Sequence, residues 1–181
     1  MEKLRRFTKA KKEVEDMIKF LLGLAIVLFC TICGRLFAKK YRIRRGFFTQ
    51  LQEFNQRFLA EISYYRRPVK EFCDQFTYEG EFQELLQNFF ALQEHGELIK
   101  HASLLDLSAY SFLTEEERTF VGDYFLTLGR GDSASQKAYF SSADTSLKNY
   151  RTSSETECKK YTDLYTKLGF LCGLAILIVI V

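Results

Sequence analysis

Residue types that build enzyme sites and disulfide-stabilised domains are scarce in this chain of 181 residues. It has two histidines, one proline and five cysteines, and three of the cysteines lie in long apolar runs. His95 and His101 have no cysteine or carboxylate at ligand spacing, and no Ser/His/Asp, Cys/His or paired-carboxylate arrangement stands out. Nothing resembles a disulfide framework, which is typical of a reducing compartment. We therefore expect no catalytic, metal-binding or cofactor-binding site.

Alternation of apolar and polar residues, the pattern of a half-buried strand, is also lacking. Apolar residues instead recur at three- and four-residue steps over residues 47–65 and 82–92, with a short helix expected after Pro68. The sequence therefore predicts an all-α protein, an antiparallel helical bundle with one N-terminal and one C-terminal transmembrane helix.

Two apolar runs lie near the ends of the chain. Residues 20–34 read FLLGLAIVLFCTICG and residues 168–181 read LGFLCGLAILIVIV. Each run spans roughly 21–23 Å as a helix, less than the ~30 Å hydrocarbon core. Lys19 and Arg35 can snorkel, and Tyr161 and Tyr165 can anchor the second run at the interface. We predict transmembrane helices over 18–38 and 167–181, a basic tail over 1–17 and a helical bundle over 39–166.

Each apolar run has an alternative interpretation. A buried terminal core helix would need a polar side for water, which the run 168–181 lacks. A cleaved signal peptide rarely carries acidic residues such as Glu13, Glu15 and Asp16, and no small-x-small cleavage site follows the first run. Both runs are therefore interpreted as membrane anchors.

The basic residues predict which side of the membrane holds residues 39–166. More lysines and arginines border this segment than lie in the N-terminal tail, so the positive-inside rule favours a cytoplasmic middle domain. The net charge of +3 is largely this topology signal. It therefore gives no support for nucleic-acid binding.

Residues 114–117 read TEEE and predict the start of a helix, because Thr114 can cap while Glu117 reaches back to the cap. The stretch LGRGDSASQ, residues 128–136, follows that helix. Gly129 stands where a left-handed helix stop is usual, and Ser133 with Gln136 has capping-box spacing, with Asp132 as a rival cap. The RGD tripeptide would have to face outside to act in adhesion, and the stretch lacks a phosphate-loop ending. We predict a turn followed by one uninterrupted helix into the second apolar run.

Small residues inside the spans favour helix packing over chemistry. Cys30-Thr31-Ile32-Cys33 has metal-ligand spacing but no second pair. Gly169 and Gly173 form a GxxxG motif, a plausible helix-contact face.

Three short stretches of the chain form a recognisable series: Ala60-Glu61-Ile62 with Tyr64 and Pro68, Leu128-Gly129 with Asp132 and Gln136, and Lys167-Leu168-Gly169-Phe170-Leu171 with Gly173-Leu174. In their order and spacing they resemble the stage III sporulation protein AB family of endospore-forming bacteria. Lys167 replaces a serine of the family pattern, the tail 1–17 is longer than usual, and residues 69–113 match only by helical pattern. The resemblance makes Glu61, Tyr64, Pro68, Gly129, Asp132, Gln136, Gly169 and Gly173 the candidates for structural or partner contacts.

The resemblance implies a non-enzymatic subunit of the channel-like complex in the mother-cell membrane around the forespore. The family's cytoplasmic domain is similar to the inner-membrane platform protein of type II secretion systems. The implied partners are other stage III sporulation membrane proteins, a secretion-type ATPase of the same operon and the lipid bilayer, with no nucleic acid. A two-span regulatory sensor, signalling along the C-terminal helix, is the alternative, and an integral-membrane enzyme is a third hypothesis without a visible site.

Overall fold

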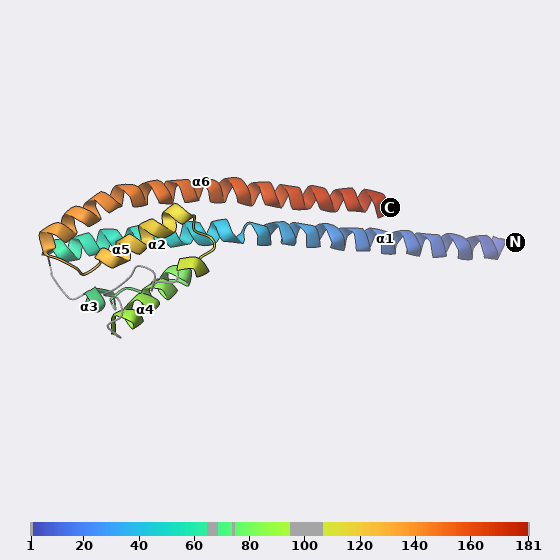
Figure 1. Ribbon diagram of the computed structural model, residues 1–181. Coiled ribbons are helices and arrows are strands. Elements are labelled where there is room, and N and C mark those ends of the chain that lie inside the picture. The colour runs from blue at the N-terminus through green and yellow to red at the C-terminus, as the bar shows by residue number, and fades with distance from the viewer. Residues whose placement is uncertain (1, 65–68, 74, 95–106, 181) are drawn as a thin grey trace. The chain divides into compact units, whose positions relative to one another are not determined.

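The computed structural model describes residues 2–64, 69–73, 75–94 and 107–180, and this part of the chain is all-α (Figure 1). The helices are α1 (Glu2–Phe37), α2 (Lys39–Tyr64), α3 (Val69–Cys73), α4 (Gly80–Glu94), a 3-10 turn η3 (Leu107–Ala109), α5 (Glu115–Thr127) and α6 (Ser133–Ile180). The expected fold class is confirmed. His95 and His101 lie outside the described residues.

The chain divides into two compact units. The central unit is Lys40–Glu157, and the terminal unit combines Met1–Lys39 with Cys158–Val181. The long helix α6 continues without a break from residue 133 to residue 180, as the sequence predicts. Each unit has its own packing and is described separately.

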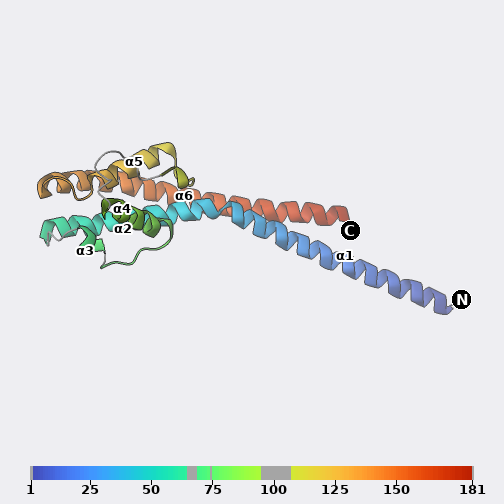
Figure 2. The ribbon, with the colours of Figure 1, turned by 60° about the horizontal axis from the view of Figure 1, so that its bottom comes forward.

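The central unit is built on α2, α5 and the first part of α6, with α3 and α4 packed beside them (Figures 1 and 2). The ring of Tyr150 lies 5.2 Å from that of Phe120, centroid to centroid, and the ring of Phe140 lies 5.0 Å from that of Tyr124. Residues further along α6 therefore meet residues nearer the start of α5, so the two helices are antiparallel. This is the arrangement expected for helices joined by a short turn.

Aromatic rings dominate the core of the central unit. Phe54, at the middle of α2, lies within 6.4 Å, centroid to centroid, of five other rings. These rings are Phe58, Phe72, Tyr78, Phe82 and Tyr124. They come from α2, α3, α4, α5 and the segment before α4, so the Phe54 side chain contacts four helices and one connecting segment of the central unit. Most pairs meet edge to face, the arrangement that the quadrupole of aromatic rings favours.

Helix α2 begins earlier than the apolar pattern predicts. The periodic residues start at Phe47, but the helix already begins at Lys39. Only Ala38 separates α1 from α2, and its N–H still donates to the carbonyl of Gly34 at 3.3 Å. Residues 2–17, expected as a basic tail, are the first turns of α1. Lysine and arginine are good helix formers, so a basic flank extends an apolar helix readily.

The segment before α4 is held by an amide pairing. Gln50 donates from Nε2 to the carbonyl of Glu79 at 2.8 Å, and its Oε1 accepts from the Glu79 N–H at 2.6 Å. The side-chain amide of Gln50 therefore pairs with both backbone polar groups of Glu79, as the backbone of an adjacent strand would. The chain then enters α4 at Gly80, which has a left-handed φ of +60°.

The terminal unit is an antiparallel pair formed by α1 and the end of α6. Glycines mark the contact: Gly23 faces Leu177, Gly173 faces Val27, Gly169 faces Cys30 and Gly34 faces Tyr165. Residue numbers rise along α1 as they fall along α6, so the two helices keep one register over about three turns.

Two helical stretches, Met17–Tyr64 and Ser133–Val179, contain windows long and apolar enough to cross a membrane. Only 18% and 6% of these windows are buried. A core helix of a soluble protein would be mostly buried, so the alternative of a buried terminal helix loses support.

Candidate functional site

The turn between α5 and α6 carries three of the residues singled out in the sequence. Gly129 has φ of +74°, the left-handed helix stop that was predicted, and Gly131 has φ of +83°. Asp132 then caps α6, because its Oδ1 accepts from the Ser135 N–H at 2.7 Å and its carbonyl accepts from the Gln136 N–H at 3.0 Å. The bond from the backbone N–H of Ser135 lowers the pKa of Asp132.

The capping box predicted for Ser133 and Gln136 is wrong. Ser133 is already the first residue of α6, and the rival cap Asp132 takes the capping position. Gln136 reaches back only weakly, from Nε2 to the Gly131 carbonyl at 3.4 Å. A carboxylate accepts backbone N–H groups at a helix N-terminus better than a hydroxyl does, because it also complements the helix dipole.

The turn at residues 129–132 lies beside the end of α2 and the start of α3, and we call these three parts together the tip. A Cβ on Gly129 would stand 3.1 Å from Cγ2 of Val69, the first residue of α3. Phe58 of α2 packs against Phe140 of α6 at 5.0 Å. The end of α2 therefore lies near the start of α6, as Figures 1 and 2 both show.

The candidate residues at the end of α2 differ in their surroundings. Glu61 is buried, whereas Tyr64 is 82% exposed. Among the described residues of the central unit, Tyr64 is the one large apolar residue that is exposed rather than buried or partly buried. Pro68 lies outside the described residues.

A buried ion cluster joins α2, α5 and α6 at the other end of the central unit. Arg44 donates from Nε to both carboxylate oxygens of Glu117 at 3.1 Å, and from Nη2 to Oε1 at 2.6 Å. Its Nη1 donates to Glu157 of α6. Glu117 also closes the capping box of α5, accepting from the Thr114 N–H at 2.9 Å. The predicted capping box is confirmed, and the same carboxylate does both tasks.

The guanidinium of Arg44 and the carboxylates of Glu117 and Glu157 are paired through hydrogen bonds and opposite charge. The side chains of Arg44 and Glu117 are only 11% and 2% exposed. Burial alone lowers the pKa of Arg44 and is the largest single influence, but the hydrogen bonds and charges of Glu117 and Glu157 together outweigh it, so the pKa of Arg44 is raised. The guanidinium therefore stays charged, and the cluster is a structural clamp between three helices.

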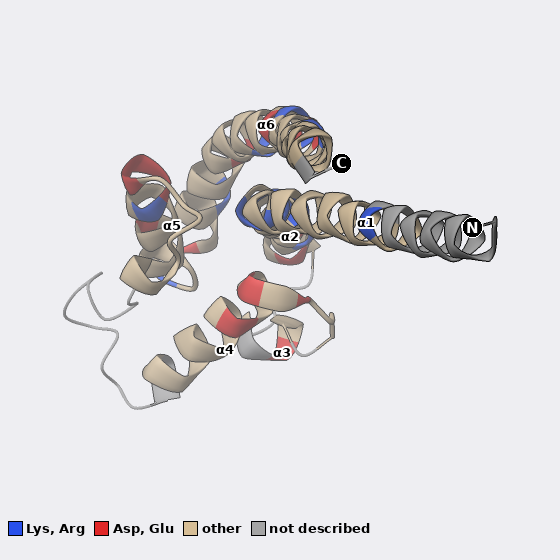
Figure 3. Ribbon diagram, turned by 90° about the vertical axis from the view of Figure 1, so that its right-hand side faces the viewer, with Lys and Arg blue, Asp and Glu red and all other residues tan. Residues whose placement is uncertain are grey.

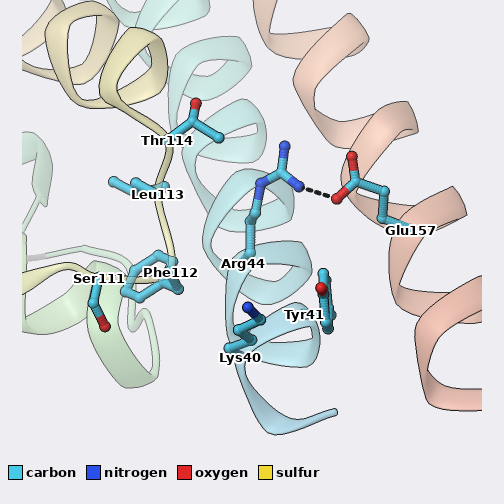
Figure 4. A pocket seen from close by; sticks show the side chains of 8 residues that line it. All are labelled: Lys40, Tyr41, Arg44, Ser111, Phe112, Leu113, Thr114 and Glu157. Atoms are coloured by element: carbon cyan, nitrogen blue, oxygen red, sulfur yellow. Dashed lines mark hydrogen bonds and ion pairs between the residues drawn. The ribbon is translucent and has the colours of Figure 1, made fainter. Parts of the chain in front are cut away.

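A pocket of about 210 Å³ adjoins this clamp (Figure 4). Lys40, Tyr41 and Arg44 line it from α2, Glu157 lines it from α6, and residues 111–114 line it from the segment before α5. Figure 4 shows Arg44 directed at Glu157. Within the pocket, Arg44 and Glu157 are paired to each other.

In the sequence, Arg44 is one of several basic residues that border the middle segment and Glu117 is a capping residue, so the clamp was not predicted. A signal for it does exist. Arg44 stands three, four and seven residues before Phe47, Phe48 and Leu51, all of which are buried. A cation within the apolar stripe of a helix needs a carboxylate partner in the fold. The start of α2 is rich in basic residues, as its blue turns in Figure 3 show. The neighbours of Arg44 include Lys39, Lys40, Arg42 and Arg45, so composition alone does not distinguish Arg44 from them.

A second polar group sits within the aromatic core. The hydroxyl of Tyr124 donates to Oδ1 of Asn55 at 3.0 Å, and Nδ2 of Asn55 donates to the Phe140 carbonyl at 3.2 Å. Both side chains have no exposed surface. Burial raises the pKa of Tyr124 well above its usual range. The three residues belong to α2, α5 and α6, so this group too joins the three long helices.

The two glycines of the GxxxG motif lie where α1 and α6 approach each other closely in the terminal unit. A Cβ on Gly169 would stand 2.5 Å from the Cys30 carbonyl oxygen, and one on Gly173 would stand 2.7 Å from Cα of Val27. Real Cβ atoms do not come so near to backbone, so only glycine permits these contacts. Cys30 belongs to this interface, as expected of a small residue within a span.

No group of three His, Cys, Asp or Glu residues with metal-binding geometry occurs in the part of the chain that the structure describes. The absence of a metal site at His95 and His101 stays a prediction. Tyr64 and the turn at residues 129–132 are exposed.

The comparison with known proteins supports the likeness noted in the sequence. The chain matches the family model described as Stage III sporulation protein AB (spore_III_AB) over residues 19–181. Searches of curated proteins and of solved structures find no match. Because the family match extends over nearly all of it, the chain belongs to the stage III sporulation protein AB family.

Proposed function

We propose that the chain is a non-enzymatic membrane platform subunit of the stage III sporulation complex, a channel-like assembly linking mother cell and forespore. The observation that carries the proposal is the family match over residues 19–181. The sporulation role follows from the family. The platform role is supported by an architecture of two apolar helices around a central helical unit, with no catalytic arrangement among the described residues.

Both apolar helices cross the mother-cell membrane in this proposal, with the central unit in the cytoplasm. The basic residues that flank the central unit favour this orientation. Native cysteines are poor reporters of it, since Cys73 and Cys158 are buried. An exposed reporter such as Ser141→Cys is suitable, because Ser141 is open to solvent. An impermeant maleimide should label it only in opened cells, and labelling in intact cells would overturn the orientation.

The proposed partner of the central unit is a secretion-type ATPase, together with other stage III sporulation membrane proteins. The tip is the proposed contact, because Tyr64 is exposed there and tyrosine is enriched at protein interfaces. The turn at residues 129–132 is exposed beside it.

Gene deletion in the spore-forming host tests the proposal. Heat-resistant spores should be lost, and the wild-type chain should restore them and co-purify with the ATPase. Tyr64→Ala should weaken co-purification at unchanged expression, because it removes a solvent-exposed ring without opening the core. Gln56→Ala, also exposed on α2, is the matched control. Normal sporulation without the gene would contradict the proposal, and a sporulation defect with altered signalling but no ATPase contact would favour a regulatory sensor.

A further inference from the structure

An apolar groove runs along one side of the helix pair in the terminal unit. Its volume is about 540 Å³, and its lining exposes far more apolar than polar surface. Cys30, Cys33 and Gly34 line it from α1, and Gly169 and Cys172 line it from α6, with Phe37, Tyr165 and Leu168 at its edges. The backbones approach closely at Gly34 and Gly169, and the small neighbouring side chains leave the groove unfilled.

The groove ends beside a group of basic residues, which we call the basic collar. It consists of Arg35, Lys39, Lys159, Lys160 and Lys167, all exposed. The same stretches contain one acidic residue, Asp163, which pairs with Lys167 at 2.6 Å. Lys39 follows Phe37 by two residues and Lys167 follows Tyr165 by two, a rise of about 3 Å in each helix. The collar is therefore positive overall and lies within reach of the groove's end.

We propose that the groove holds one acyl chain of an anionic phospholipid, with the lipid phosphate at the basic collar. The inference rests on the proposed membrane location of these helices. An apolar groove facing lipid must be filled by an apolar partner, and a basic rim at its end selects a partner with a negative head. A second copy of this chain would bring a second basic collar against the first, so charge disfavours it as the occupant.

The groove's chemistry suits a flexible tail. Its walls consist of thiol, glycine, leucine and aromatic surface, and the strong hydrogen-bond donor among the lining side chains, the Tyr165 hydroxyl, belongs to a residue at its edge. Phe37 and Tyr165, 6.3 Å apart between centroids, stand at the headgroup end. Aromatic side chains are favoured at this level of a bilayer. The lipid would then bridge α1 and α6 on the side that the glycines leave open.

The test uses the full-length chain in a neutral detergent, titrated with phosphatidylglycerol or with phosphatidylcholine of the same acyl chains. Native mass spectrometry should show phosphatidylglycerol retained on the chain, and its addition should raise the melting temperature. Phosphatidylcholine should do neither. Equal retention of the two lipids would overturn the inference.

Two variants locate the lipid. Cys33→Trp fills the groove and should reduce retention by roughly tenfold, whereas Ile32→Trp, at a neighbouring exposed position outside the groove, should not. Lys39→Gln with Lys167→Gln keeps the groove and should reduce retention by a similar factor or more. Lys137→Gln with Lys148→Gln removes as much charge from exposed positions of the central unit and should have no effect.

The outcomes separate this inference from the proposed function. If the wild-type chain is washed from membranes by alkaline carbonate, the membrane role itself fails. If the chain resists carbonate but wild type and both test variants bind phosphatidylglycerol alike, the lipid site alone fails. If Cys33→Trp abolishes a dimer and leaves lipid binding intact, a second copy occupies the groove and the inference is wrong.

Discussion

The two units of this chain hold their helices together by opposite means. In the central unit, large side chains fill the space between helices, and Phe54 alone meets five rings. In the terminal unit, helices approach where side chains are missing, at Gly34, Gly169 and Gly173. The membrane location proposed for the terminal unit gives this difference a physical reason: water drives large apolar groups together, whereas lipid does not, so close backbone approach must supply the attraction. Each packing style agrees with the medium that the proposed function gives to its unit.

Phe54→Ala should have the largest effect, because it empties the centre of the aromatic core. Large-to-small changes of a buried phenylalanine lose about 3–5 kcal/mol. Urea unfolding of the full-length chain in detergent, followed by near-ultraviolet circular dichroism of the aromatic residues, measures the loss. Phe37→Ala, at a ring 70% exposed in the terminal unit, is the control and should leave that transition in place. Equal losses for the two variants would break the comparison.

Arg44→Met should have a similar effect by a different route. The change leaves Glu117 buried without its cation, which typically costs about 3–5 kcal/mol. Arg44→Met combined with Glu117→Met should recover part of the loss, since an apolar pair needs no charge compensation. The same urea unfolding measures the double variant. If it is no more stable than Arg44→Met, Glu117 contributes to stability through the capping box of α5 and not through its ion pair with Arg44.

Gly169→Leu should separate the helices of the terminal unit, because the new side chain meets the Cys30 backbone. Overpacking of a close contact costs about 1–3 kcal/mol. Spin labels at Leu24 and Ile176, both exposed, should report a larger separation. Gly46→Leu is the control, because nothing lies within 4 Å of a Cβ at Gly46. An unchanged distance in Gly169→Leu would contradict the glycine contact.

Tyr124→Phe keeps the ring packing of the central unit and removes one hydroxyl. Asn55 then loses a donor in a fully buried position, which should lower stability by about 1–3 kcal/mol. Thermal melting of the full-length chain measures the change. Tyr139→Phe is a matched control at a partly exposed position. A Tyr124→Phe variant as stable as the wild type would show that rings alone specify this core.

Gly46→Ala should have the smallest effect of these changes, and it is the one expected to stabilise the folded chain. Gly46 lies within α2 with free space around its Cα, so alanine removes backbone freedom from the unfolded chain. The gain should be about 0.5–1 kcal/mol, seen as a higher melting temperature. A lower melting temperature would mean that this position needs glycine for a reason other than packing.

The sequence predicts well those features that depend on neighbouring residues. The capping box at Thr114 and Glu117, the glycine stop at Gly129 and the unbroken helix from residue 133 all follow from local patterns, and the structure confirms them. Asp132 was recognised as one of two possible caps, because both satisfy the same local rule. Choosing between them needs the position where the helix starts, which spacing alone leaves open.

Contacts between residues far apart in the sequence could not be predicted from local patterns. The clamp pairs Arg44 with carboxylates 73 and 113 residues away, and Asn55 meets Tyr124 at a separation of 69. The position of Arg44 in the apolar stripe indicates that it needs a carboxylate partner, but it does not indicate which glutamate supplies it. The GxxxG motif predicts a glycine face on the second apolar run. That Gly169 of this face contacts Cys30 depends on the register of the two helices, which the sequence does not specify.

The distances along the chain within the clamp also govern the order of events during synthesis. A ribosome adds about 5–20 residues per second, so Glu117 follows Arg44 by roughly 4–15 s and Glu157 by roughly 6–23 s. Until then the guanidinium has no buried partner, and the start of α2 must stay in water. The central unit therefore cannot close early around an unfinished chain. Its last required residue, Glu157, emerges just ahead of the second apolar run, so completion of the fold and delivery of that run are consecutive steps.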